Sequence, residues 1–231
     1  MCGLLLAFRA TLRLMSVDSY SIPEGVTSAD LVDAMGRMHR HRCHILDLVS
    51  PTPGRRLMGT AVTISYFPTC SAALEPGTYN FADLFYEAVG DESDGRVLVL
   101  ASNGHPDISL GGGTKLARVE KMSLAGVLAD GRLRDFDELS SYDFATFCRG
   151  EATRWGGDVV TPYQVNVPVV VSQVGIHPGD FVYADSAGAV VVPPAQLESV
   201  VEEALRVNEE DRSAIRTIAD EEVFGGDRDR R

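Results

Sequence analysis

Short apolar segments alternate along this chain with segments in which apolar and polar residues recur at helical spacing. The apolar segments are rich in β-branched residues and are bounded by glycine, proline or aspartate, which is typical of strands. Two of them, residues 96–101 and 124–129, are apolar almost throughout, as expected for strands buried on both faces. We predict strands at residues 57–66, 96–101, 124–129, 165–174, 181–184 and 189–192.

The helical segments carry apolar residues three and four positions apart. The first of them opens with Thr-Ser-Ala-Asp, a combination typical of a helix N-terminus. The last is long and charged, with a single apolar stripe along one face. We predict helices at residues 27–38, 80–88, 114–122 and 194–222, and a helical turn at 135–139.

This order of elements, with no internal repeat or low-complexity linker, predicts one α/β domain with a C-terminal helical arm. We assign residues 16–222 to the domain, and residues 223–231 to a disordered polar tail. Residues 1–15 are expected to be a disordered extension, or to precede the natural start of the protein. Their apolar run lacks the preceding basic region and the cleavage site of a signal peptide.

Composition excludes several classes of function. The net charge is −12, from 33 acidic and 21 basic residues, and a chain this acidic repels a nucleic-acid backbone. No apolar run approaches the ~20 residues that span a membrane. The four cysteines have no metal-ligand spacing, which favours reduced thiols in a cytoplasmic protein.

The chemistry of the chain is concentrated in residues 103–135. Three consecutive glycines, residues 111–113, precede a predicted helix, and such a turn presents backbone N–H groups that suit an anion. The loop after the strand at 124–129 ends in Arg134 and Asp135. The arginine fork suits a carboxylate or an enolate oxygen, and the aspartate suits Mg²⁺ or Mn²⁺. Together they would stabilise an enolate beside a carboxylate, although the same residues also occur in ordinary surface turns and ion pairs.

Four segments, in order along the chain, resemble motifs of the RraA-like family. This family includes 4-hydroxy-4-methyl-2-oxoglutarate aldolases, oxaloacetate decarboxylases and regulators of ribonuclease E. The resemblance runs from about residue 27 to about residue 210. The segments are TSADLVDAMGR (27–37), PGRRLMGTAVT (53–63), LAGVLADGRLRD (124–135) and PGDFVYADSAGAVVVP (178–193).

The resemblance implies a swivelling β/β/α fold, similar to phosphohistidine domains, and assembly as a homotrimer or a dimer of trimers. It also implies a class II aldolase or decarboxylase that uses Mg²⁺ or Mn²⁺ and cleaves a small 2-keto acid through a pyruvate enolate. Arg134 would hold the keto oxygen and Asp135 the metal. The backbone N–H groups of the loop would hold the pyruvyl carboxylate. The loop residues are Gly113, Thr114, Lys115 and Leu116.

The chain departs from the family at Thr114, where relatives have an acidic residue. Threonine cannot act as a carboxylate base. Asp107 or Asp130 would have to replace that acid, and His105 is a further acid–base candidate. The resemblance also implies a glutamate from the C-terminal arm of a neighbouring subunit, either Glu209 or Glu210.

Three functions stay open at this point. Asp135 favours the metal-dependent aldolase or decarboxylase, because the family's regulators typically lack this aspartate. Thr114 favours the alternative, a non-catalytic regulator that binds a ribonuclease. The unusual loop also fits a divergent biosynthetic lyase acting on an uncommon keto acid.

Overall fold

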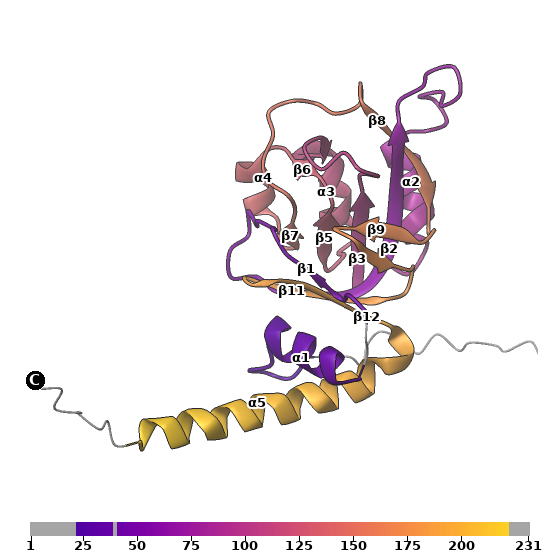
Figure 1. The fold of residues 1–231 in the computed structure, drawn as a ribbon. Coiled ribbons are helices and arrows are strands. Elements are labelled where there is room, and N and C mark those ends of the chain that lie inside the picture. Colours follow the sequence, from indigo (N-terminus) through magenta and orange to yellow (C-terminus); the bar gives the residue numbers. More distant parts are fainter. Residues whose placement is uncertain (1–21, 39–40, 222–231) are drawn as a thin grey trace, which may run out of the picture.

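The computed structural model describes residues 22–38 and 41–221 (Figure 1). The expected extension at 1–15 and tail at 223–231 lie outside these residues. The helices are α1 (Ser28–Met38), α2 (Phe81–Val89), α3 (Gly113–Lys121), α4 (Phe136–Ser141) and α5 (Leu197–Ala219), the last preceded by a 3₁₀ turn at Pro194–Gln196. The strands are β1 (His44–Ile45), β2 (Leu57–Pro68), β3 (Arg96–Ala101), β4 (Ser109–Gly111), β5 (Gly126–Ala129), β6 (Arg132–Leu133), β7 (Ala145–Phe147), β8 (Val160–Val165), β9 (Val169–Val171), β10 (Val174–Ile176), β11 (Phe181–Asp185) and β12 (Gly188–Val192).

One large sheet organises the described part of the chain, in the order β1-β12-β11-β2-β3-β5-β7, with β8 also paired to β2. The pairs β2–β3, β3–β5 and β5–β7 are parallel, and the remaining pairs of this sheet are antiparallel. The α/β architecture with a C-terminal helix is therefore confirmed. None of the helices that the structure describes is long and apolar enough to cross a membrane.

Alternate residues of β3 explain how the sheet is covered on both faces. Leu98 and Leu100 face a core cluster that includes α2 and α3, whereas Val97 and Val99 face a cluster that includes the β9–β10 hairpin. A strand buried on both faces needs an apolar side chain at every position, as the sequence indicated.

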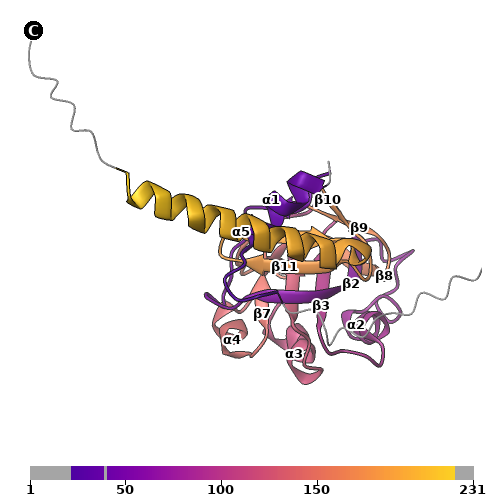
Figure 2. The same cartoon turned by 90° about the horizontal axis from the view of Figure 1, so that it is seen from below.

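The helical arm forms a separate layer (Figures 1 and 2). α1 and α5 lie side by side across β11 and β12, and residues of all four elements form a third apolar cluster. α1 begins at a reciprocal cap, because Thr27 Oγ1 donates to Asp30 Oδ2 (2.9 Å) and the Asp30 N–H donates back to Thr27 Oγ1 (3.4 Å). Towards its end α5 leaves the sheet, and Ile215 and Ile218 are exposed.

The predicted strand at 165–174 was wrong. Val165 ends β8, and the rest of the segment forms the hairpin of β9 and β10. The chain turns at Asn166, Ser172 and Gln173, whose φ angles are 48°, 48° and 70°. None of these residues is glycine, so the β-branched run on either side concealed the turns. The short strands β4, β6 and β7 were not predicted.

Candidate functional site

A small parallel pair of strands builds the candidate site. β4 pairs with β6, with Ser109 opposite Arg132 and Gly111 opposite Leu133. Because the two strands run in the same direction, the residues that follow them emerge at the same edge. The backbone N–H of Arg134 donates to the carbonyl of Gly111 (2.9 Å), which joins the two ends directly.

Asp135 is held against the first turn of α3. Its backbone lies in the left-handed region (φ 61°, ψ 49°), and it is the N-cap residue of α4. Its Oδ2 accepts a hydrogen bond from the backbone N–H of Gly113 (3.1 Å). A carboxylate at a helix N-terminus interacts favourably with the helix dipole.

The two glycines at the start of α3 are required by this close approach. A β-carbon on Gly112 would lie 2.6 Å from Asp135 Oδ2, and one on Gly113 would overlap the Glu138 carboxylate. Any other residue would displace the side chain of Asp135 or Glu138, or push α3 away from this loop. The glycine run therefore serves a close approach between two segments as well as a turn.

A pocket of about 130 Å³ opens at this junction. Within the described residues, the Arg134 side chain forms no hydrogen bond or ion pair, and Asp135 forms no ion pair. Both are therefore free to bind a ligand. The pocket is lined by Ser109, Gly111, Gly112, Thr114, Lys115, Arg134, Asp135 and Trp155.

Lys115 adds a second cation to the pocket. Its Nζ lies 5.3 Å from the centre of the Phe81 ring. Burial lowers the pKa of this ammonium, and repulsion from Arg118 and Arg134 lowers the pKa further. Two neighbouring cations in one pocket raise the free energy of the empty site, and an anion would relieve that repulsion.

Fewer backbone N–H groups of the predicted loop are available to bind a carboxylate than the sequence suggested. The N–H of Gly113 donates to Asp135, and the N–H of Leu116 donates to the carbonyl of Gly112 (3.0 Å). Leu116 itself is buried in the core. The N–H groups of Thr114 and Lys115 have no acceptor in the described part of the chain, and they remain the candidates for binding a carboxylate.

The proposed replacement acids lie outside this pocket. Asp107 pairs with Arg132 (3.2 Å). Asp130 is buried at the end of β5, where it pairs with Arg149 (3.3 Å), and burial raises the pKa of its carboxyl group more than Arg149 lowers it. His105 donates its backbone N–H to Ser102 Oγ (3.2 Å) and does not line the pocket.

Glu209 and Glu210 lie on α5, which packs against α1, β11 and β12 rather than against α3 (Figure 1). Glu210 pairs with Arg37 (2.7 Å) and Glu209 with Arg216 (2.8 Å). Neither residue reaches the pocket of its own chain, so the expected contribution from a neighbouring subunit stays a prediction.

Glu138 is an acid that the sequence analysis missed. Its carboxylate lies against Gly113 and accepts a hydrogen bond from Tyr142 Oη (2.9 Å), which is also 3.2 Å from the carbonyl oxygen of Gly113. Burial and this hydrogen bond to Glu138 raise the pKa of the Tyr142 phenol. In sequence Glu138 is the third residue after Asp135 and carries no motif of its own, so nothing local indicated its proximity to α3.

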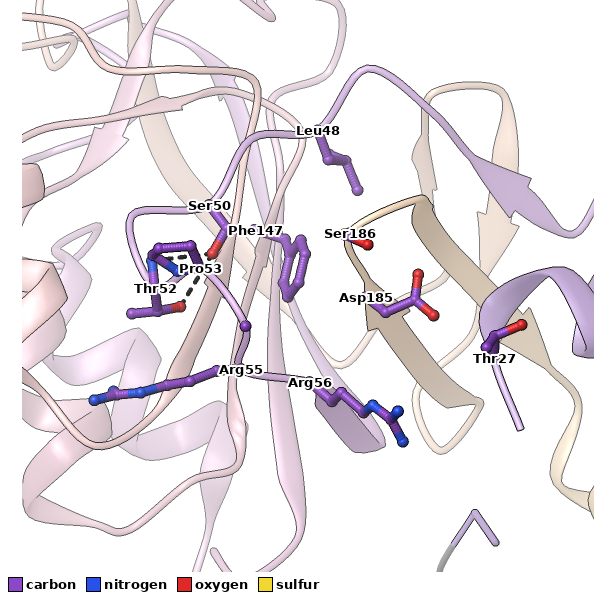
Figure 3. Close-up of a pocket in the computed structure, with 11 residues that line it drawn as sticks. Thr27, Leu48, Ser50, Thr52, Pro53, Arg55, Arg56, Phe147, Asp185 and Ser186 are labelled. Atoms are coloured by element: carbon purple, nitrogen blue, oxygen red, sulfur yellow. Dashed lines mark hydrogen bonds between the residues drawn. The ribbon is translucent and has the colours of Figure 1, made fainter. Parts of the chain in front are cut away.

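A separate pocket of about 410 Å³ lies beside the start of α1 (Figure 3). Two of its three charged lining residues, Asp185 and Arg55, already have partners, whereas Arg56 forms no hydrogen bond or ion pair with the described residues. Asp185 accepts hydrogen bonds from the N–H and Oγ of Ser28 (2.8 and 2.7 Å), and Arg55 points away toward the carbonyls of Tyr142 and Phe144. The segments 53–63 and 178–193 therefore contribute to the fold here.

Comparison with known proteins decides the family. Residues 28–191 match the family model described as RraA-like, Aldolase/RraA. The chain belongs to the RraA-like family. A Halalkalibacterium halodurans protein provisionally named 4-hydroxy-4-methyl-2-oxoglutarate aldolase is 30% identical over 134 residues, 58% of this chain and 63% of that protein. The chain thus matches less than two thirds of that relative's length.

Two solved structures share the fold. An uncharacterized protein from Pseudomonas syringae pv. tomato has a TM-score of 0.71 and 26% identity, with 86% of this chain and 90% of that chain covered. Streptomyces coelicolor RraAS2, described as an unusual member of the RNase ES inhibitor RraA protein family, has a TM-score of 0.72 and 24% identity, with 83% and 93% covered. The expected RraA-like fold is confirmed.

Proposed function

We propose that this RraA-like protein is a divalent-metal-dependent lyase that cleaves a small 2-keto acid beside a pyruvate enolate. The observation that carries this proposal is the juxtaposition of Arg134 and Asp135, without ion pairs in the described chain, with the unpaired N–H groups of Thr114 and Lys115. A guanidinium, a carboxylate and a helix N-terminus together suit a carboxylate next to a developing oxyanion.

The donor set fits Mg²⁺ or Mn²⁺. In the described residues, no three His, Cys, Asp or Glu side chains converge as a centre built of protein ligands alone would require. Mg²⁺ does not need such a centre, because it keeps several waters and binds through one or two carboxylates together with its substrate. Asp135 would hold the ion, which would act as a Lewis acid on the keto oxygen.

Different groups of the chain would bind different parts of the substrate. The N–H groups of Thr114 and Lys115 would bind the carboxylate at C1, and the Lys115 ammonium would add charge attraction. Arg134 would donate to the oxygen at C2. That oxygen gains negative charge as the enolate forms, so the hydrogen bond from Arg134 strengthens in the transition state and accelerates the reaction.

Proton transfer requires an acidic side chain, which Thr114 does not provide. Glu138 does not line the pocket, but its carboxylate lies beside Asp135 at the first turn of α3, against Gly113, and is hydrogen-bonded to the phenol of Tyr142. We assign to Glu138 the proton that is exchanged with C3 of the enolate, directly or through a water. This assignment compensates for the missing acid in the loop.

Pyruvate release from oxaloacetate, with and without MgCl₂, tests the proposal. Asp135→Asn is the informative variant, because asparagine tolerates the left-handed backbone and can still accept the Gly113 N–H. We expect release by the wild type to depend on metal and release by the variant to fall to the metal-only background. Asp137→Asn, on the exposed surface of α4, is the matched control and should retain activity.

A regulator that binds a ribonuclease is the second candidate. The uncharged, exposed Thr114 at the position of the family's loop acid favours it. A folded wild type that releases no pyruvate above the metal-only background would overturn the enzymatic proposal, and pull-down with a ribonuclease would then test the regulator.

For either function we propose that the protein assembles as a homotrimer. Light scattering would measure the mass of the assembly.

A further inference from the structure

A second pocket adjoins the candidate site. Its volume is about 290 Å³, and it shares Ser109, Lys115 and Trp155 with the smaller pocket. The two pockets are therefore neighbours, and we call them together the cleft, which extends from the N-terminus of α3 to β8. The second pocket is lined mainly by the aromatic and apolar side chains of Tyr66, Leu74, Pro76, Tyr79, Phe81, Trp155, Val160 and Pro162.

The two parts of this cleft differ in chemical character. The smaller pocket holds Arg134, Asp135 and the α3 N-terminus. Among the described residues, Lys115 is the one charged residue that lines the second pocket, and its polar lining is otherwise uncharged (Thr69, Ser71, Asn80, Ser109 and Thr161). Tyr66 is buried, and its hydroxyl donates to the carbonyl of Leu110 (2.7 Å), so its polar end is already satisfied. The second pocket therefore favours an apolar group, and Lys115 marks the boundary between the two parts.

The size of the second pocket suits an aromatic ring. An apolar cavity of about 150 Å³ is known to hold benzene. A pocket of about 290 Å³ accommodates a ring with substituents, whereas a methyl or carboxylate group would leave most of it to water. The aromatic lining residues Tyr79 and Trp155 provide favourable contacts for an aromatic ligand.

We infer that the substrate is a 4-hydroxy-2-keto acid that carries an aromatic ring, or a similarly large apolar group, at C4. This inference rests on the proposed function. The pyruvyl part would bind beside Arg134, and the ring would occupy the second pocket. Cleavage breaks the C3–C4 bond, the C4 hydroxyl loses its proton to become an aromatic aldehyde, and the electron pair forms the enolate. A proton at C3 then gives pyruvate, so protons and electrons balance.

Trp155 is the residue best placed to select this substrate. It lines both pockets, it bridges to Ser109 of β4, and 59% of its surface is exposed. A ring in the second pocket would cover part of that exposed indole. Trp155 is also the only tryptophan of the chain, so its fluorescence reports on this cleft alone.

The experiment compares kcat/KM for pyruvate release from 4-hydroxy-2-oxo-4-phenylbutanoate, 4-hydroxy-4-methyl-2-oxoglutarate and oxaloacetate, each with MgCl₂. We expect the phenyl substrate to exceed the methyl substrate at least tenfold. Trp155→Ala should lower kcat/KM for the phenyl substrate about tenfold, chiefly through KM, and should lower kcat/KM for oxaloacetate less, because oxaloacetate does not extend into the second pocket. Tyr86→Ala removes an exposed aromatic side chain of α2 outside the cleft and serves as the control.

The outcomes separate this inference from the proposed function. If oxaloacetate is decarboxylated but the phenyl substrate is no better than the methyl one, or if Trp155→Ala affects all substrates equally, the inference is overturned and the proposed function survives. If no substrate releases pyruvate, the proposed function fails. Titration of Trp155 fluorescence with benzaldehyde then tests the second pocket alone, and absence of a saturable change would reject it.

Discussion

The Asp135 carboxylate accepts a hydrogen bond of 3.1 Å from the backbone N–H of Gly113, a residue 22 positions earlier in the chain. This bond joins the loop after β6 to the first turn of α3. It places a carboxylate, the neighbouring Arg134 and the free N–H groups of α3 around one pocket. The spacing between the proposed metal ligand and the proposed carboxylate site is therefore set by backbone contacts.

Gly113→Ala should disrupt this junction. The new methyl group would overlap the Glu138 carboxylate, so α4 and α3 must separate or Glu138 must move. We expect the variant to lose roughly 1–3 kcal/mol of unfolding free energy, as overpacked sites do, together with most pyruvate release. Urea unfolding measures the first effect.

Gly36→Ala is the matched control for that substitution. Gly36 lies within α1, is exposed, and has open space where its β-carbon would be added. Because alanine favours a helix over glycine, this variant should gain up to about 1 kcal/mol. Equal unfolding free energies for Gly113→Ala and the wild type would contradict the packing described for α3.

Much of the fold follows from local patterns in the sequence. β3 and α2 were predictable because an uninterrupted apolar run and an Asn80 cap with Gly90 after the helix are local signals. β4 and β6 were not, because strands of two or three residues leave no periodicity. Their pairing is a long-range property of the chain, and it is this pairing that brings the site together.

The same distinction applies to the site. Arg134 and Asp135 could be predicted from their motif, and Thr114 was recognised as a departure from it. Glu138 comes to lie against Gly113 through the packing of α4, and Trp155 reaches the cleft through a bridge to Ser109. No spacing along the chain reveals either contact. Glu138 could have been found only by asking which acid replaces the one absent at Thr114.

Glu138→Gln should separate proton transfer from substrate binding. Glutamine keeps the size of the side chain and can still accept the hydrogen bond from Tyr142, but it cannot exchange a proton. We expect the exchange of pyruvate methyl protons with D₂O, followed by NMR in the presence of Mg²⁺, to slow about 100-fold. The affinity for pyruvate, measured by Trp155 fluorescence, should change little.

Glu120→Gln is a suitable control, because Glu120 accepts a hydrogen bond from the Asp143 backbone at the far end of α3. Its exchange rate should match the wild type. Exchange at the wild-type rate in Glu138→Gln would show that another group carries the proton.

The lowered pKa of Lys115 predicts how pH affects both folding and binding, with opposite signs. Burial, together with Arg118 and Arg134, makes the ammonium lose its proton at a lower pH than in the unfolded chain. The folded state therefore binds fewer protons between the two pKa values, and this group contributes more to stability as pH rises through the folded pKa. A bound carboxylate instead favours the ammonium, so affinity for pyruvate should be highest below that pKa and fall above it.

Titration of Trp155 fluorescence with pyruvate between pH 7 and pH 10 measures this fall. Lys115→Met should bind more weakly and lose the dependence on pH, whereas Lys115→Arg should retain binding at high pH because the guanidinium stays charged. A parallel fall in the wild type and Lys115→Met would assign the titration to a different group.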